Sequence, residues 1–86
     1  MKYTVIYLPS AEQQLADLWL AAADRSAITS ASDKIDQLLK DNPLAVGESR
    51  VSNIRILFEE PLVVVYDVRE ADLVVKVWAV WQWKSQ

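Results

Sequence analysis

Apolar and polar residues change their spacing along the chain, and the changes predict the first two elements. Residues 2–8 (KYTVIYL) are rich in β-branched and aromatic side chains and predict a first strand, which Pro9 ends. Apolar residues then recur at helical spacing over residues 10–23, where Ser10 and Gln13 resemble a capping box. This segment is predicted to be an amphipathic helix that buries its apolar stripe against another layer.

A second helix is predicted after the polar break at residues 24–26. Its apolar residues repeat the helical spacing up to Asp41, and Asn42-Pro43 stops it. Residues 43–53 (PLAVGESRVSN) contain the single glycine and show no sustained period, so they predict a connecting loop.

Three more strands are predicted at residues 54–59, 62–68 and 73–81, with turns at Glu60-Pro61 and at residues 69–72. A meander with short turns makes these three strands neighbours, and the helical detour lets the last strand lie antiparallel beside the first. The predicted fold is an α+β domain of order β-α-α-β-β-β. It has two layers, with a helix hairpin on one face of a four-stranded antiparallel sheet in the order 1-4-3-2.

Strand alternation predicts which side chains face the helices. In the last strand these are Leu73, Val75, Val77, Ala79 and Trp81, while Lys76, Trp78 and Gln82 point away. In the other two strands they are Ile54, Ile56, Phe58, Val64 and Tyr66. Trp81, together with Trp83 if the strand continues, would then complete the core.

Two helices cover one face of a sheet, so the second face is predicted to be open. It would carry the apolar side chains Ile6, Leu57, Val63, Val65, Trp78 and Val80, bordered by Arg55, Arg69 and Lys76. An apolar patch with a charged rim is typical of an interaction surface, which predicts a protein partner. The alternatives are that the C-terminal tail or the 43–53 loop covers the patch, or that two copies pair there as a homodimer.

The composition predicts one globular domain over residues 1–86, since 52% of the residues are hydrophobic and 24% are charged. The absence of cysteine and of an apolar run long enough to span a membrane predicts a cytoplasmic protein. The net charge of -3 comes from residues 10–41, which hold six acids and three bases, whereas the remainder holds six of each. This balance argues against direct binding of free nucleic acid, which basic proteins favour.

Several short motifs occur together in this sequence. They are the strand-Pro-x-Ala opening at residues 9–11, the loop from Asn42-Pro43 through Gly47 to Arg50, Arg55 in the second strand, and the Leu-Val-Val-Val-Tyr strand ending at Tyr66. In this order and spacing they resemble the RelE/ParE family of bacterial toxins from type II toxin-antitoxin systems, a group that includes plasmid stabilisation proteins. The resemblance covers nearly the whole chain.

The resemblance implies a small toxin that is neutralised by a cognate antitoxin, a segment of which wraps the toxin and covers exposed apolar surface. RelE-like members cleave messenger RNA on the ribosome, whereas ParE-like members inhibit DNA gyrase. The ribosome and DNA gyrase are therefore the two targets that the resemblance suggests.

RNA cleavage through the 2'-hydroxyl needs a group that takes the proton, a cation and an acid. RelE-like proteins supply these with basic residues on the middle strands and a basic-aromatic C-terminal segment. Here Val63 stands where the resemblance implies an arginine, Trp83 stands where it implies a basic residue, and the chain has no histidine. The remaining catalytic candidates, all weak, are Arg55, Lys76 and Lys84.

Arg50, Arg55 and Arg69 are predicted to make charge contacts with a target or an antitoxin. For Arg50 and Arg55 the alternative is a surface ion pair with Glu48 or Glu59. Glu59-Glu60 is not predicted to bind a metal, because adjacent strand residues point to opposite faces, and no cofactor is predicted.

The sequence thus favours a toxin that is ParE-like or degenerate and acts by protein binding rather than by bond making. Two alternatives stay open: a ribosome-dependent mRNA endoribonuclease of the RelE type, and a non-toxic protein-interaction module with the same fold.

Overall fold

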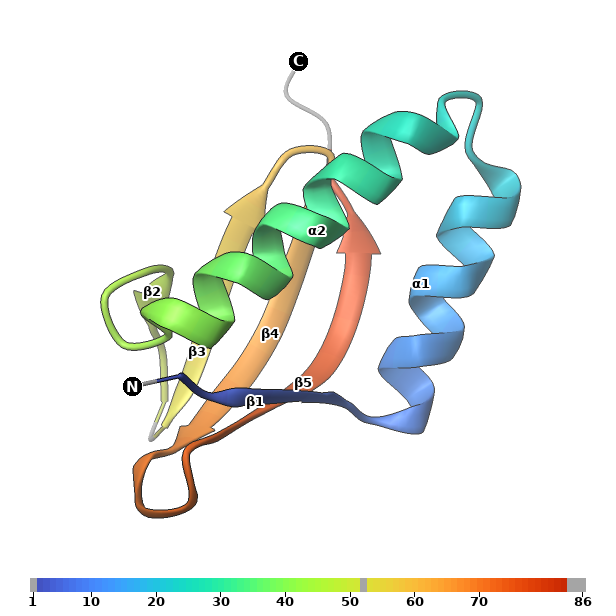
Figure 1. Cartoon of the computed structure of the whole chain (residues 1–86). Helices are drawn as coiled ribbons and strands as arrows, with labels where there is room; N and C mark the ends of the chain where they lie inside the picture. The colour runs from blue at the N-terminus through green and yellow to red at the C-terminus, as the bar shows by residue number, and fades with distance from the viewer. Residues whose placement is uncertain (1, 52, 84–86) are drawn as a thin grey trace.

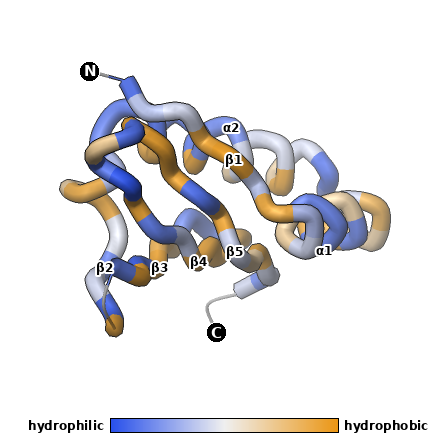
Figure 2. The backbone as a smooth tube through the Cα atoms, turned by 90° about the horizontal axis from the view of Figure 1, so that it is seen from below, coloured by the Kyte–Doolittle hydropathy of each residue, from blue (hydrophilic) through white to orange (hydrophobic). Residues whose placement is uncertain are grey.

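The computed structural model describes residues 2–51 and 53–83 and places two helices on one side of a sheet (Figures 1 and 2). The elements are β1 (Thr4–Tyr7), α1 (Pro9–Ala21), α2 (Arg25–Asp41), β2 (Glu48–Ser49), β3 (Ile54–Glu59), β4 (Leu62–Arg69), a 3₁₀ turn (Glu70–Asp72) and β5 (Val74–Gln82). The sheet order is β1-β5-β4-β3-β2. This confirms the predicted α+β class and the relative order of the four predicted strands.

The predicted loop at residues 43–53 contains a fifth strand, β2, so the prediction of four strands was incomplete. Glu48 pairs with Ile56 and Ser49 with Arg55, antiparallel to β3. A strand of two residues is too short to show a period in the sequence, and pairing with β3 is what forms it.

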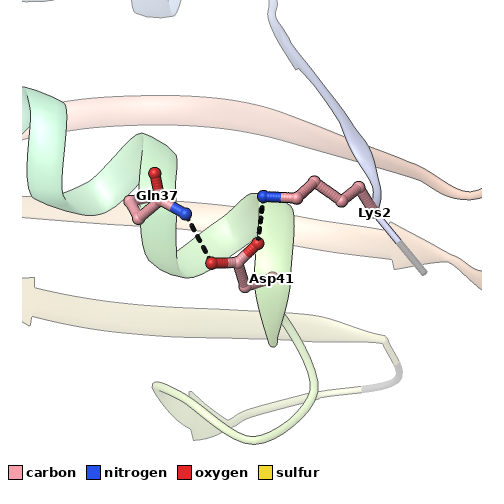
Figure 3. A network of polar contacts seen from close by, with 3 residues as sticks. All are labelled: Lys2, Gln37 and Asp41. Atoms are coloured by element: carbon pink, nitrogen blue, oxygen red, sulfur yellow. Dashed lines mark hydrogen bonds and ion pairs between the residues drawn. The ribbon is translucent and has the colours of Figure 1, made fainter.

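β1 runs parallel to β5, with Thr4–Tyr7 opposite Val74–Val77, and the prediction of an antiparallel pair was wrong. The reason lies at the end of α2, where the Tyr3 N–H donates to the Lys40 carbonyl at 2.9 Å. The Lys2 ammonium also lies 2.9 Å from the Asp41 carboxylate, which Gln37 contacts as well (Figure 3). α2 therefore returns the chain to the start of β1, so β3 and β5 run in the same direction as β1.

The two helices begin in different ways. α1 starts at Pro9, whose missing N–H needs no partner at this position, and Leu8 before it gives no side-chain cap. The predicted capping box therefore does not form, and Gln13 donates to Asp17 instead, at 2.8 Å. Before α2, the Asp24 carboxylate accepts hydrogen bonds from the Ser26 hydroxyl and the Ala27 N–H, which lower the pKa of Asp24. Within the described residues, neither helix is long and apolar enough to cross a membrane.

The core lies between the helices and the sheet. α2 contributes four buried residues at helical spacing, Ile28, Ala31, Ile35 and Leu39, whereas α1 fully buries only Ala11. From the sheet the core receives Leu57, Leu62, Val64, Tyr66, Val68, Val75, Val77 and Val80. The predictions that Val64, Tyr66, Val75 and Val77 face the helices are confirmed.

A β-bulge in β5 reverses the alternation of its side chains. Val65 pairs with Ala79 but Tyr66 pairs with Val77, so Trp78 is the extra residue on β5. Beyond the bulge Val80 turns into the core, where it is 2% exposed. The predictions that Ala79 and Trp81 face the helices were therefore wrong, because the extra residue shifts the alternation by one.

The alternation of β3 is also opposite to the prediction. Arg55 pairs with Tyr66 and Leu57 with Val64, and paired residues share a face of the sheet. Leu57 is therefore buried in the core, and the three other apolar residues of the strand, Ile54, Ile56 and Phe58, face the open side.

Candidate functional site

Four aromatic side chains are exposed on the open side of the sheet. They are Phe58, Trp78, Trp81 and Trp83, each between 41 and 46% exposed, and we call them the aromatic face. Phe58 and Trp83 meet edge to face with ring centroids 5.5 Å apart. Val63 pairs in register with Phe58 and Trp81 and is completely buried. Phe58, Val63, Trp81 and Trp83 are thus neighbours in one apolar surface, and Trp78 lies on the same side of the sheet.

Four of the six apolar residues predicted for the open face lie there. Ile6, Val63, Val65 and Trp78 lie on the open side, but Leu57 and Val80 belong to the core for the reasons given above. Phe58, Trp81 and Trp83 were not predicted to lie there. Three tryptophans within six residues were the available signal, but the bulge decides which of them face outward.

A buried carboxylate lies beside the aromatic face. Asp67 on β4 is 5% exposed, and its Oδ2 accepts a hydrogen bond from the Trp78 indole N–H at 2.7 Å. Its Oδ1 has no hydrogen-bond partner within the described residues and lies 3.4 Å from the Arg69 Nε. Asp67 therefore fixes the indole of Trp78 and keeps Arg69 close to the sheet. The acid within the run LVVVYDV was the sequence signal for this contact.

Arg55 has a structural role in the loop between α2 and β3. Its guanidinium donates to the Val46 carbonyl at 3.1 and 3.3 Å and to the Gly47 carbonyl at 3.3 Å. The Tyr66 hydroxyl on the same face lies 2.8 and 2.9 Å from the Pro43 and Val46 carbonyl oxygens, which share its single proton. Burial raises the pKa of Tyr66, and the neighbouring Arg55 opposes this rise. Arg55 therefore holds the loop against the sheet.

The other predicted charges are dispersed. Arg50 forms an ion pair with Glu48 at 3.0 Å, which is the alternative that the sequence offered for this residue. Glu59 pairs with Lys34 instead, at 3.5 Å. Arg55 and Arg69 border one polar hollow of about 530 Å³, which Glu70 and Asp72 also line. Lys76 lies on the open side opposite Asp67, and Lys84 is outside the described residues.

A second surface was not predicted from the sequence: an apolar groove of about 830 Å³ between α1, α2 and β1. Its lining residues are Val5, Ile6, Tyr7, Glu12, Leu15, Ala16, Trp19, Leu20, Ile28, Thr29, Ser32 and Asp33. At its base the Tyr7 hydroxyl donates to Asp36 at 2.7 Å, and burial and this carboxylate raise the pKa of Tyr7. The sequence signal was weak, because the apolar residues of α1 were assigned to the core.

Comparison with solved structures identifies the fold. One chain of the toxin-antitoxin complex RelBE2 from Mycobacterium tuberculosis matches this chain with a TM-score of 0.78 and 18% identity, over 95% of this chain and 92% of that chain. The chain has the RelE toxin fold. The isolated RelE toxin of E. coli matches with a TM-score of 0.73 and 15% identity, over 98% of this chain and 87% of that one.

A chain of the chromosomal ParDE system from P. aeruginosa matches this RelE-like chain with a TM-score of 0.67 and 16% identity, over 96% and 98% of the two chains. No family model matches the sequence, and no curated protein matches it. The expected RelE-like architecture is therefore established by the fold rather than by sequence similarity.

The RelE-like fold does not bring the predicted catalytic candidates together. Arg55 and Lys76 belong to adjacent rungs of the sheet, paired through Tyr66 and Asp67 respectively, so their side chains leave opposite faces. Val63, at the position where the resemblance implies an arginine, is buried between aromatic residues. The open side of this RelE-like sheet therefore presents aromatic side chains rather than a cluster of basic ones.

Proposed function

We propose that this chain is the toxin of a type II toxin-antitoxin pair, that it acts by binding a protein target, and that a cognate antitoxin neutralises it. The RelE-like fold supports the proposal, because chains of the RelBE2 and ParDE toxin-antitoxin systems have the same architecture. The observation that carries it is the aromatic face, with four rings at 41 to 46% exposure on the sheet side that neither α1 nor α2 covers. Covering an exposed ring of this size contributes about 1 kcal/mol or more, which favours a bound partner.

The charges of the open side favour binding over RNA cleavage. The open side has two bases among the described residues, Arg69 and Lys76, and Arg69 lies against the Asp67 carboxylate. Arg55 lies on the other face and is bonded to loop carbonyls. Stabilising the transition state of phosphate cleavage requires cations aimed at one point. Among the described residues, Lys76 is then the base of this side that has no ion pair, which is too little positive charge for that task.

Inducible expression in a bacterium tests the function. Expression alone should arrest growth, and co-expression of the protein encoded in the adjacent reading frame should restore it. Primer extension on cellular messengers should show no new cleavage sites. Co-purification with DNA gyrase or with ribosomes then identifies the target.

Two outcomes would replace the proposal. Normal growth without the antitoxin would favour a non-toxic interaction module. Growth arrest with messenger cleavage that disappears in the Arg55→Ala/Lys76→Ala variant would favour an endoribonuclease of the RelE type.

The role of the aromatic face is tested with the purified partner. The Phe58→Ala/Trp81→Ala variant should bind the antitoxin at least about tenfold more weakly, because central aromatic residues contribute most to interfaces. Leu44→Ala/Val51→Ala is a matched control, since both side chains are exposed and apolar but lie in the loop before β3. Equal affinities of the two variants would contradict the assignment of this face.

A further inference from the structure

The groove between α1, α2 and β1 has an apolar floor and an exposed apolar rim. Leu15 and Ile28 line its floor, and on the rim Leu20 is 62% and Trp19 40% exposed. The Trp19 ring is held in place, because its indole N–H donates to Thr29 at 3.2 Å and the Arg25 guanidinium lies 4.6 Å from its centroid. The rim is therefore preorganised, which lowers the entropy cost of binding.

The charged residues that line the groove are both acidic. Glu12 on α1 and Asp33 on α2 border it, and no lining residue is basic. Within the described part of the chain neither carboxylate has a hydrogen bond or an ion pair from its side chain. Arg25 lies outside the lining, where it stacks on the rim ring of Trp19 and donates to the Trp19 and Leu20 carbonyls, and Lys34 pairs with Glu59. The charged residues that line the groove are therefore two carboxylates without an ion-pair partner among the described residues.

We propose that this groove is a second docking surface, and that its occupant is a basic, apolar-faced segment of the partner protein. Apolar side chains of that segment cover Trp19 and Leu20, and its lysine or arginine side chains meet Glu12 and Asp33. A second copy of this chain fits poorly, because its net charge is -3 and this excess of acids over bases comes from residues 10–41, which contain the same two helices. The inference rests on the proposed function only in taking the partner to be the antitoxin.

The groove also adjoins the open side of the sheet. Ile6 lines the groove, and on the edge strand β1 its side chain shares a rung with Lys76 of the open side. A single partner chain can therefore reach both surfaces by passing around the edge of β1. Arg50, Arg55 and Arg69, which are predicted to contact a target or an antitoxin, would attract acidic side chains, whereas the groove requires basic ones.

The experiment uses the whole chain and a displayed library of random peptides about 12 residues long, which is enough to fill one groove. Peptides are selected on the wild-type chain and then depleted on the Ala16→Arg variant, which places a bulky cation in the groove at an exposed position. The surviving peptides are expected to be basic and apolar. Acidic survivors, or no survivors, would overturn the proposal.

The affinities of the selected peptides test the electrostatic part of the proposal. The Glu12→Gln/Asp33→Asn variant should bind them about three- to tenfold more weakly, and a higher salt concentration should reduce this difference. Glu70→Gln/Asp72→Asn is the matched control, because it changes the net charge equally but lies in the 3₁₀ turn outside the groove. Equal weakening by both variants would show a general charge effect and reject the site.

Two controls separate this proposal from others. Urea unfolding of the Ala16→Arg variant must give the wild-type midpoint, and Leu20→Ser, which removes an exposed rim residue, must also weaken binding. Sedimentation tests the second copy: a dimer that Ala16→Arg dissociates would overturn the proposal. Because peptide binding does not depend on growth arrest, a chain that binds basic peptides without arresting growth would reject the proposed toxin function alone.

Discussion

Asp67 is a charged residue in the middle of an apolar strand, and its carboxylate is almost completely buried. Such a group persists because its oxygens have compensating neighbours, here the Trp78 indole N–H at 2.7 Å and the Arg69 Nε at 3.4 Å. The carboxylate orients a ring of the aromatic face from below. Asp67 is therefore a positioning residue for the surface that we assign to the partner.

The Asp67→Ala variant should lose about 2 kcal/mol of unfolding free energy, because the partly buried hydrogen bond from the Trp78 indole N–H loses its acceptor. Asp67→Asn keeps an acceptor and should lose less. Urea unfolding of both variants, with the exposed Asp72→Ala as control, measures the difference. Equal losses for alanine and asparagine would contradict the role of the hydrogen bond.

Gly47 is a second position at which local contacts determine the residue type. Its φ is +71°, and a Cβ would lie 2.7 Å from the Ile56 carbonyl oxygen and 2.8 Å from the Tyr66 hydroxyl. Gly47→Ala should therefore destabilise the fold by about 2 kcal/mol or more in urea unfolding. Ala45→Gly in the same loop is the reverse control, with an expected loss below about 1 kcal/mol. A neutral Gly47→Ala variant would show that the loop moves freely.

Among the elements, α2 could be predicted from the sequence and the strand faces could not. Ile28, Ala31, Ile35 and Leu39 recur at a spacing that places them on one face of a helix, and all four are buried. In β3 the alternating apolar residues Ile54, Ile56 and Phe58 suggested a core-facing side, yet Leu57 is the residue that faces the core. Arg55 lies on the same side as Leu57 and donates to the carbonyls of the loop. In β5 the residues from Val77 to Trp81 are all apolar, so their sequence contains no mark of the bulge.

The bulge gives a direct test with two neighbouring residues. Val80→Asn should cost about 3 kcal/mol of unfolding free energy, because it places an amide in the core. Trp81→Asn should cost only about 1 kcal/mol, because this side chain lies on the open side. Regular alternation without the bulge would give the opposite order in urea unfolding.

At the scale of the whole molecule, the direction of β1 depends on the unequal helices. α1 has 13 residues and α2 has 17, so α2 is longer by about 6 Å and carries the chain back to the beginning of β1. The sequence contains both helices, but the angle at which α2 crosses the sheet depends on packing. The groove between α1, α2 and β1 depends on the same packing, which is why it could not be foreseen.

The contact between Lys2 and Asp41 makes this long-range arrangement sensitive to acid. Hydrogen bonds from Lys2 and then Gln37 lower the pKa of Asp41 below its ordinary value of 3.8. A lowered pKa in the folded state contributes stability above that ordinary value, and this contribution is lost as the pH falls through the folded pKa. The urea midpoint of Asp41→Asn should therefore decrease less than that of the wild type between neutral pH and about pH 2.5.

Asp33→Asn is the control for this experiment, because the Asp33 carboxylate has no hydrogen bond or ion pair within the described residues. Its pH dependence should follow that of the wild type more closely. Identical acid sensitivity of Asp41→Asn and the wild type would show that the contact at Asp41 is not coupled to folding.

The pairing of Thr4–Tyr7 with Val74–Val77 has a consequence for the order of events during synthesis. β1 is made first, but β5, its strand partner among the described residues, emerges from the ribosome after some seventy further residues. Until then β1 has no strand to pair with, and the bulged strand that carries Trp78 and Trp81 is absent. A nascent chain therefore displays neither finished surface, and a binding partner can distinguish completed molecules from growing ones.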